Sequence, residues 1–155
     1  MRPDPEHRAQ TTLVHARDVV AHLNDGIIDM LRLPLYHAPP PLSFGGRGVG
    51  TGPFPVLQGS GAHAQLNVDL SETTGLTFGA NQALLLLRQA CMDVAVEVEL
   101  DVGDLLLIGN RRVLHGRTSF EPRLDVTDRW LLRTMIRSGD LWDWRVYVED
   151  HCLVF

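Results

Sequence analysis

The sequence predicts a mainly β protein with flanking helices, an α+β chain whose short strands form an antiparallel sandwich or barrel. Two observations support this fold class. Stretches of alternating apolar and polar residues, at 94–100 and 128–137, are separated by residues typical of turns. Two longer stretches, 11–35 and 78–95, instead repeat apolar residues every three or four positions, as amphipathic helices do.

In the first half of the chain we expect a helix over 11–35, with Thr12 as a candidate cap and Pro34 ending the pattern. Residues 38–62 are dominated by proline and glycine and predict a long loop with short extended pieces, typical of a lid. Apolar and polar residues then alternate from 63 to 70, which predicts a short strand.

In the second half, 78–95 gives the clearest helical pattern, and 94–100 switches to the alternation of a strand. Residues 102–104 predict a turn, and the continuous apolar run 105–108 predicts a buried strand. The stretch 128–137 predicts a further strand. Without an internal repeat or a convincing boundary, residues 1–155 are expected to form a single domain.

The composition excludes several classes of protein. The chain has 155 residues and a net charge of −5 without a basic run, which argues against a nucleic-acid or anionic-membrane surface. No apolar run approaches the ~18 residues that span a bilayer, and the first ten residues lack the apolar core of a signal peptide. Cys91 and Cys152 lie far apart, as expected for two reduced thiols. We therefore expect a soluble, cytoplasmic protein.

The residues that carry chemistry lie between 103 and 137. Polar residues 110–112 lead to His115, and the following strand alternates so that Arg129 and Arg133 share one face. Guanidinium groups that face a protein interior need an anion, and a dicarboxylate ligand would supply one. The structural alternative is a core histidine at 115, with the two arginines paired to carboxylates across the sheet.

Residues 103–120, GDLLLIGNRRVLHGRTSF, resemble the C-terminal signature of the taurine dioxygenase superfamily, specifically its clavaminate synthase-like branch. That branch includes hydroxylases of free asparagine and arginine. The resemblance implies the C-terminal part of a double-stranded β-helix, or jelly roll. It also implies Fe(II) as cofactor, 2-oxoglutarate as co-substrate, and hydroxylation of a free or carrier-bound amino acid.

By resemblance, His115 is the second histidine of a two-histidine, one-carboxylate metal site. Arg129, fourteen residues later, matches the arginine that binds the distal carboxylate of 2-oxoglutarate. Arg133 matches the arginine that contacts the carboxylate of the amino-acid substrate. No catalytic residue is expected beyond these metal and co-substrate ligands.

The resemblance extends to two positions nearer the N-terminus. Asp69, forty-six residues before His115, matches an aspartate that reads the amino or guanidino end of the substrate. Thr11 matches a threonine that hydrogen-bonds 2-oxoglutarate, with Thr12 as the neighbouring candidate. The simpler alternatives are that Asp69 only starts a turn and that Thr11 only caps a helix.

The other part of the metal site is missing from the sequence. Iron(II) in this family needs a His-x-Asp or His-x-Glu pair, yet none of the seven histidines has an acidic residue two positions later. One hypothesis is an oxygenase fragment that acts with a complementary N-terminal half. The other is a non-catalytic jelly-roll remnant or binding module that retains an arginine-lined carboxylate pocket. In either case exposed sheet edges should favour aggregation or dimerisation.

Overall fold

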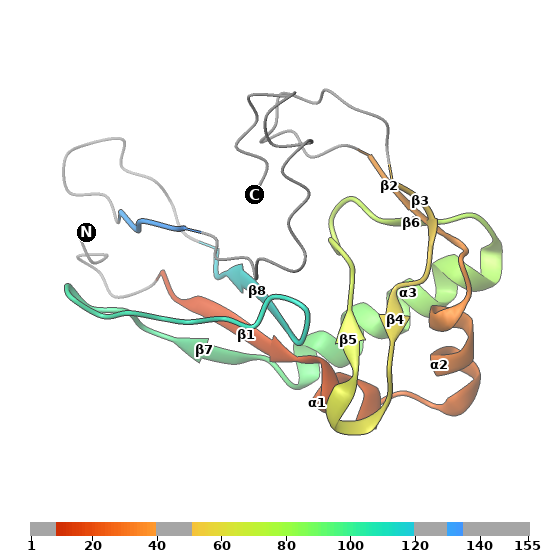
Figure 1. Cartoon of the computed structure of the whole chain (residues 1–155), viewed down its shortest axis with the longest axis horizontal. Helices are drawn as coiled ribbons and strands as arrows, with labels where there is room; N and C mark the ends of the chain where they lie inside the picture. Colours follow the sequence, from red (N-terminus) through yellow and green to blue (C-terminus); the bar gives the residue numbers. More distant parts are fainter. Residues whose placement is uncertain (1–8, 40–50, 120–129, 135–155) are drawn as a thin grey trace, which may run out of the picture.

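The computed structural model describes residues 9–39, 51–119 and 130–134 (Figure 1). Helices and strands are both present, which confirms the α+β character of the chain. In chain order the elements are β1 (Thr11–His15), α1 (Ala16–Ala21), α2 (Asp25–Arg32), β2 (Tyr36–Ala38), β3 (Thr51–Phe54), β4 (Leu57–Gln58), a 3₁₀ turn (Gly61–His63), β5 (Gln65–Leu66), β6 (Thr74–Gly75), α3 (Phe78–Asp93), β7 (Val96–Val98) and β8 (Val113–Arg117).

The described strands form three small sheets, and every pair is antiparallel, as the sequence predicts. The sheets have the orders β7-β1-β8, β3-β2-β6 and β4-β5. In Figure 1, α3 runs from beside β6 toward β7, with α1 and α2 nearby. Helix α3 contacts α1, α2 and β6, the last of which belongs to the β3-β2-β6 sheet.

The core lies between the helices and the inner faces of the sheets. Leu31 of α2, Leu87 of α3 and Tyr36 of β2 are fully buried, and the Tyr36 hydroxyl donates to the carbonyl of Met30 at 3.2 Å. That bond satisfies the one polar group of an otherwise apolar side chain. The buried set is Val14, Ala16, Val19, Leu31, Tyr36, Val56, Leu57, Ala64, Leu66, Ala80, Ala83, Leu87, Ala90 and Cys91.

The prediction of one helix over 11–35 is wrong at its start and in its middle. Residues 11–15 form β1, because they pair with both β7 and β8, which lie far along the chain. The helix then begins at Ala16, capped by His15 rather than by Thr12. Asn24 divides the remainder, since its side chain accepts from the amide of Ile27 at 3.0 Å and starts α2. The ending before Pro34 is confirmed.

Other predictions of elements are confirmed in part. Helix α3 begins at the expected residue, where the Thr77 hydroxyl accepts from the amide of Ala80 at 3.1 Å. The described part of the loop 38–62 holds the expected short extended pieces, β3 and β4. The strand predicted over 63–70 is reduced to Gln65–Leu66, because the following residues form a tight turn instead. No helix in the described ranges is long and apolar enough to cross a membrane.

The buried strand predicted at 105–108 is wrong for the described chain. The turn before it is present, with the Asp104 amide donating to the Asp101 carbonyl at 3.2 Å. Beyond it, Leu105 is 82% exposed and Leu107 is 73% exposed, and no strand in the described ranges pairs with them. A strand forms only where a neighbouring strand hydrogen-bonds its backbone amides and carbonyls. The apolar composition of 105–108 was therefore not enough to predict a strand. Of the stretch 128–137, only 130–134 is described, and it forms no continuous strand.

Candidate functional site

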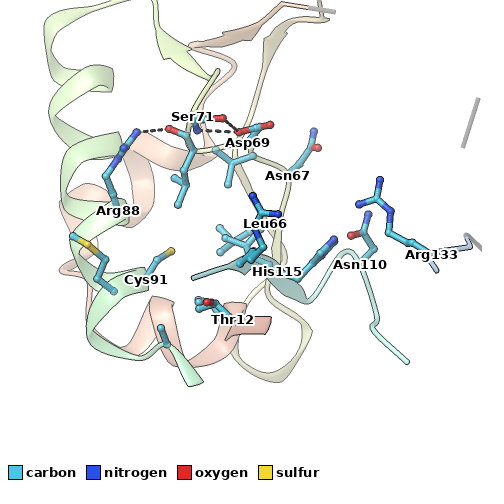
Figure 2. A pocket seen from close by; sticks show the side chains of 18 residues that line it. Thr12, Leu66, Asn67, Asp69, Ser71, Arg88, Cys91, Asn110, His115 and Arg133 are labelled. Carbon is cyan, nitrogen blue, oxygen red and sulfur yellow. Dashed lines mark hydrogen bonds between the residues drawn. The ribbon is translucent and has the colours of Figure 1, made fainter. Parts of the chain in front are cut away.

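A pocket of about 720 Å³ lies between β1, β8, the segment 66–71 and the C-terminal half of α3. Figure 2 shows its labelled side chains: Asp69 and Ser71 lie along one edge, Arg88 and Cys91 lie on α3, and Asn110 and Arg133 lie away from α3. Segments that are far apart in the sequence therefore contribute to one concave surface, which is the usual form of a small-molecule site.

Three of the predicted site residues line this pocket: Asp69, His115 and Arg133. His115 and Arg133 are both exposed, so their polar groups are accessible to a ligand. Arg129 lies outside the described residues, and the predicted convergence of its guanidinium with the His115 imidazole stays a prediction.

The two threonine candidates lie on opposite faces of β1. His115 pairs with Leu13, and directly paired residues of antiparallel strands share a face, as do alternate residues along one strand. Thr11 therefore shares the face of His115, although it is buried and does not line the pocket. Thr12 is on the other face and does line the pocket. Sequence reasoning had no way to distinguish the two, because β1 was taken for a helix.

Asp69 starts a turn and also borders the pocket. Its Oδ1 accepts from the amide of Ser71 at 2.9 Å and from the Ser71 hydroxyl, while its carbonyl accepts from the amide of Thr73 at 2.8 Å. The hydrogen bond from the Ser71 hydroxyl is the main cause that lowers the pKa of Asp69, helped by the amides of Ser71 and Glu72 and opposed by partial burial. The turn thus keeps a negative charge at the pocket edge near neutral pH.

Helix α3 contributes residues that the sequence did not single out. The Arg88 guanidinium borders the pocket and donates through Nη2 to the carbonyl of Leu70, next to Asp69. Cys91 is a free thiol, as predicted, and burial raises its pKa to about 11, so it stays protonated near neutral pH. Nothing in the periodicity of α3 separates Arg88 from an ordinary solvated arginine.

The pocket lining is richer in cations than in anions. Asp69 is the one acidic side chain that lines it in the described ranges, whereas Arg117 and Arg133 each bring a guanidinium, in addition to that of Arg88, which donates to the Leu70 carbonyl. Guanidinium groups bind carboxylates strongly and with defined geometry. The charges therefore favour a ligand that carries carboxylate groups and one cationic or polar end.

The described residues do not by themselves fit an iron site. Within 9–39, 51–119 and 130–134, no group of three histidine, cysteine or carboxylate side chains lies close enough to hold a metal ion. The iron(II) site that the sequence resemblance implies needs two imidazoles and one carboxylate. His115 alone supplies one imidazole.

Comparisons with known proteins identify the family. Residues 63–135 match the family described as "Taurine catabolism dioxygenase TauD, TfdA family". The L-asparagine oxygenase of Streptomyces coelicolor is 40% identical over 136 residues, which are 88% of this chain and 41% of that protein. Clavaminate synthase 2 of Streptomyces clavuligerus is 51% identical over 57 residues, 37% of this chain and 18% of that protein.

Solved structures agree. A structure of asparagine oxygenase in complex with Fe(II), 2S,3S-3-hydroxyasparagine and succinate superposes with a TM-score of 0.78 at 39% identity, covering 84% of this chain and 41% of that one. The non-heme iron oxygenase OrfP in complex with Fe and alpha-ketoglutaric acid has a TM-score of 0.64 at 30% identity, covering 83% and 40%. Fe(II) and 2-oxoglutarate are thus confirmed for the relatives. The chain spans about two fifths of the length of asparagine oxygenase, and its residues 63–135 carry a TauD, TfdA family domain.

Proposed function

We propose that this chain is the C-terminal part of an Fe(II)/2-oxoglutarate-dependent oxygenase that hydroxylates an amino acid or an amino-acid-derived substrate, within a jelly roll completed by other residues. The observation that carries the proposal is that Asp69, His115 and Arg133, which are far apart in the sequence, all line one pocket.

The charges of the pocket support an amino acid as the substrate. In this proposal Arg133 binds the substrate carboxylate, and the Asp69 carboxylate binds the amino, amide or guanidino end. A zwitterion needs one group of each sign, placed apart, to be bound in a single orientation. Oxidation at one carbon depends on such an orientation, since the protein's contribution to this chemistry is to hold and aim the substrate.

The co-substrate end of the site is proposed from three residues. His115 is the distal metal ligand, Arg129 binds the distal carboxylate of 2-oxoglutarate, and Thr11 hydrogen-bonds the same molecule. Thr11 shares a sheet face with His115, whereas its neighbour Thr12 is the threonine that lines the pocket. When bound, Fe(II) supplies the oxygen chemistry; this chain's own residues bind and orient the two organic molecules.

The remaining metal ligands are proposed to come from a complementary N-terminal half that carries the His-x-Asp/Glu pair. Two observations support this. The chain spans only about two fifths of the related asparagine oxygenase. In addition, Leu105 and Leu107 are apolar and exposed, and no strand of the described ranges pairs with residues 105–108. A strand from the complementary half would cover them.

The test joins this chain to the N-terminal part of the Streptomyces coelicolor asparagine oxygenase that it does not span. Succinate formation from 2-oxoglutarate is measured in the presence of Fe(II), oxygen and a panel of amino acids, with His115→Ala as the matched control. The joined protein should form succinate when one of the amino acids is present, and the control should lose at least about 100-fold.

Equal activity of the His115→Ala control would overturn the assignment of the metal ligand. A folded, inactive fusion that still binds an amino acid by calorimetry would favour the alternative, a non-catalytic binding module with an arginine-lined pocket. Activity of the isolated chain would contradict the need for a complementary half.

A further inference from the structure

The turn that presents Asp69 is attached to α3 at two places. Asn81, near the start of α3, accepts from the amide of Gly75 at 2.9 Å and donates to the Gly75 carbonyl at 2.8 Å. Arg88, seven residues further along the helix, donates to the carbonyl of Leu70. Seven residues are about two helical turns, or roughly 10.5 Å, so both side chains leave the same face of α3. The helix holds the segment 70–75 at both ends.

The helix is a rigid support for this attachment. Leu87 and Cys91, which both lie to one side of Arg88 around the helix, are buried in the core, and this fixes the rotation of α3 about its axis. The turn itself is anchored by Thr73, which is 8% exposed and whose hydroxyl accepts from the amide of Asp69 at 3.3 Å. Leu70 also packs its side chain against the core.

The Arg88 guanidinium has no ion-pair partner among the described residues. It donates to the Leu70 carbonyl, one residue after Asp69, and Figure 2 shows this bond beside the hydrogen bonds between Ser71 and Asp69. A charged donor strengthens a bond to a carbonyl. Removing the donor should release the part of the turn that carries the carboxylate.

We propose that Arg88 is a positioning residue: its bond to the Leu70 carbonyl holds the turn 69–73 so that the Asp69 carboxylate faces the pocket, and it thereby sets the affinity for the polar end of the amino-acid substrate. This inference rests on the proposed function for its consequence in binding. The attachment itself is tested on the isolated chain.

The first measurement is hydrogen exchange of the amides of Ser71, Glu72 and Thr73, which all donate within the turn. Arg88→Met keeps the stem and removes the donors, and it should accelerate exchange at these amides about fivefold to tenfold. The amides of α3 should not change. Arg88→Lys keeps a charged donor and should exchange more slowly than Arg88→Met.

A matched control is available on α2. Arg32 also donates from a helix to a loop carbonyl, that of Gly59 at 3.2 Å, but neither residue lines the pocket. Arg32→Met should leave exchange in the turn 69–73 unchanged. Unchanged exchange in Arg88→Met, or acceleration spread equally over α3, would overturn the positioning role.

The second measurement uses the joined protein. Arg88→Met should raise KM for the amino acid about tenfold, with kcat and the KM for 2-oxoglutarate within about twofold. In an Asp69→Ala background, Arg88→Met should raise KM for the amino acid by less than about twofold more, because Arg88 acts through Asp69.

If the KM increases of the two single variants instead multiplied in the double variant, Arg88 would bind the ligand directly, which contradicts the proposal. Failure of the joined protein to turn over would count against the proposed function while the exchange result still tests the attachment.

Discussion

Asp69 shows how one side chain combines a local and a functional property. Its Oδ1 organises a turn through Ser71, which is the simple alternative that the sequence already offered, and its charge borders the pocket. The same hydrogen bonds that form the turn lower the pKa of Asp69 and keep it ionised. Forming the turn and presenting a carboxylate at the pocket are therefore compatible roles of Asp69, because the hydrogen bonds of the turn keep the carboxylate ionised.

Asp69→Asn tests that coupling through stability. Since the folded-state pKa of Asp69 is lowered below its ordinary value of 3.8, its contribution is present above that pH and is lost as the pH falls through the lowered pKa. At pH 7 the urea midpoint of Asp69→Asn should be below that of the wild type, and the difference should shrink below pH 3.8. A difference that is the same at pH 7 and pH 3 would contradict the stated cause of the shift.

Gly75 lets β6 approach the start of α3. A Cβ at this position would lie 2.6 Å from the Asn81 nitrogen and 2.7 Å from the Ala80 carbonyl carbon, both backbone atoms that cannot rotate away. Gly75→Ala should therefore destabilise the protein by about 1–3 kcal/mol in urea unfolding. Gly26→Ala is the control, because its closest neighbour is the Asn24 Oδ1 at 3.4 Å. An equal effect of the two changes would refute the close-contact explanation.

Helix α3 connects the core to the pocket. One side of it packs inside through Leu87 and its neighbours, while Arg88 and Cys91 border the pocket. Because the helix has 16 residues and a well-defined cap, the sequence pattern was sufficient to locate it. Its position under the Asp69 turn depends on contacts with α1, α2 and β6, which no local pattern contains.

Two adjacent leucines test how α3 is rotated. Leu87 is fully buried, whereas Leu86 is 46% exposed. Leu87→Ala should cost about 2–5 kcal/mol of unfolding free energy, and Leu86→Ala should change it by less than about 0.5 kcal/mol. Denaturant unfolding followed by circular dichroism measures both. If Leu86→Ala cost as much as Leu87→Ala, the helix would be rotated differently from the structure.

Several large apolar side chains between β7 and β8 are exposed in the described part of the chain. They are Val102, which is 66% exposed, Leu105 and Leu107. Exposed apolar segments without strand partners are sites of association with other chains. The expected aggregation or dimerisation of the isolated chain stays a prediction that follows from this surface.

Leu105→Lys combined with Leu107→Lys tests it. The double variant should shift the isolated chain toward the monomer in light scattering, with little change in the unfolding midpoint, because both side chains are mostly exposed. Leu85→Lys, which adds a charge at a 58% exposed leucine of α3, is the control. A large loss of stability in the double variant would show that these leucines are buried in solution, and an unchanged oligomeric state would exclude this surface as the cause.

The sequence singled out three residues that line one pocket, whose roles stay predictions, and it misplaced parts of the sheets. Spacing and resemblance selected Asp69, His115 and Arg133, which line one pocket, whereas the strand at 105–108 and the helix at 11–15 were wrong. The chemical type of a candidate site residue depends on that residue alone, so it can be identified from a single position in the sequence. Strand pairing is a property of two segments, and β1 pairs with residues more than 80 positions away.

The sequence alone was sufficient to identify the family resemblance, helix α3, the turn residues and most of the candidate ligands. The packed chain was needed to choose between faces: which threonine accompanies His115, which side of α3 is buried, and that Arg88 reaches the Leu70 carbonyl. The physical reason is that the buried side of a strand or helix is the side on which another element packs. For β1 and α3 the opposite partner is supplied by distant parts of the chain.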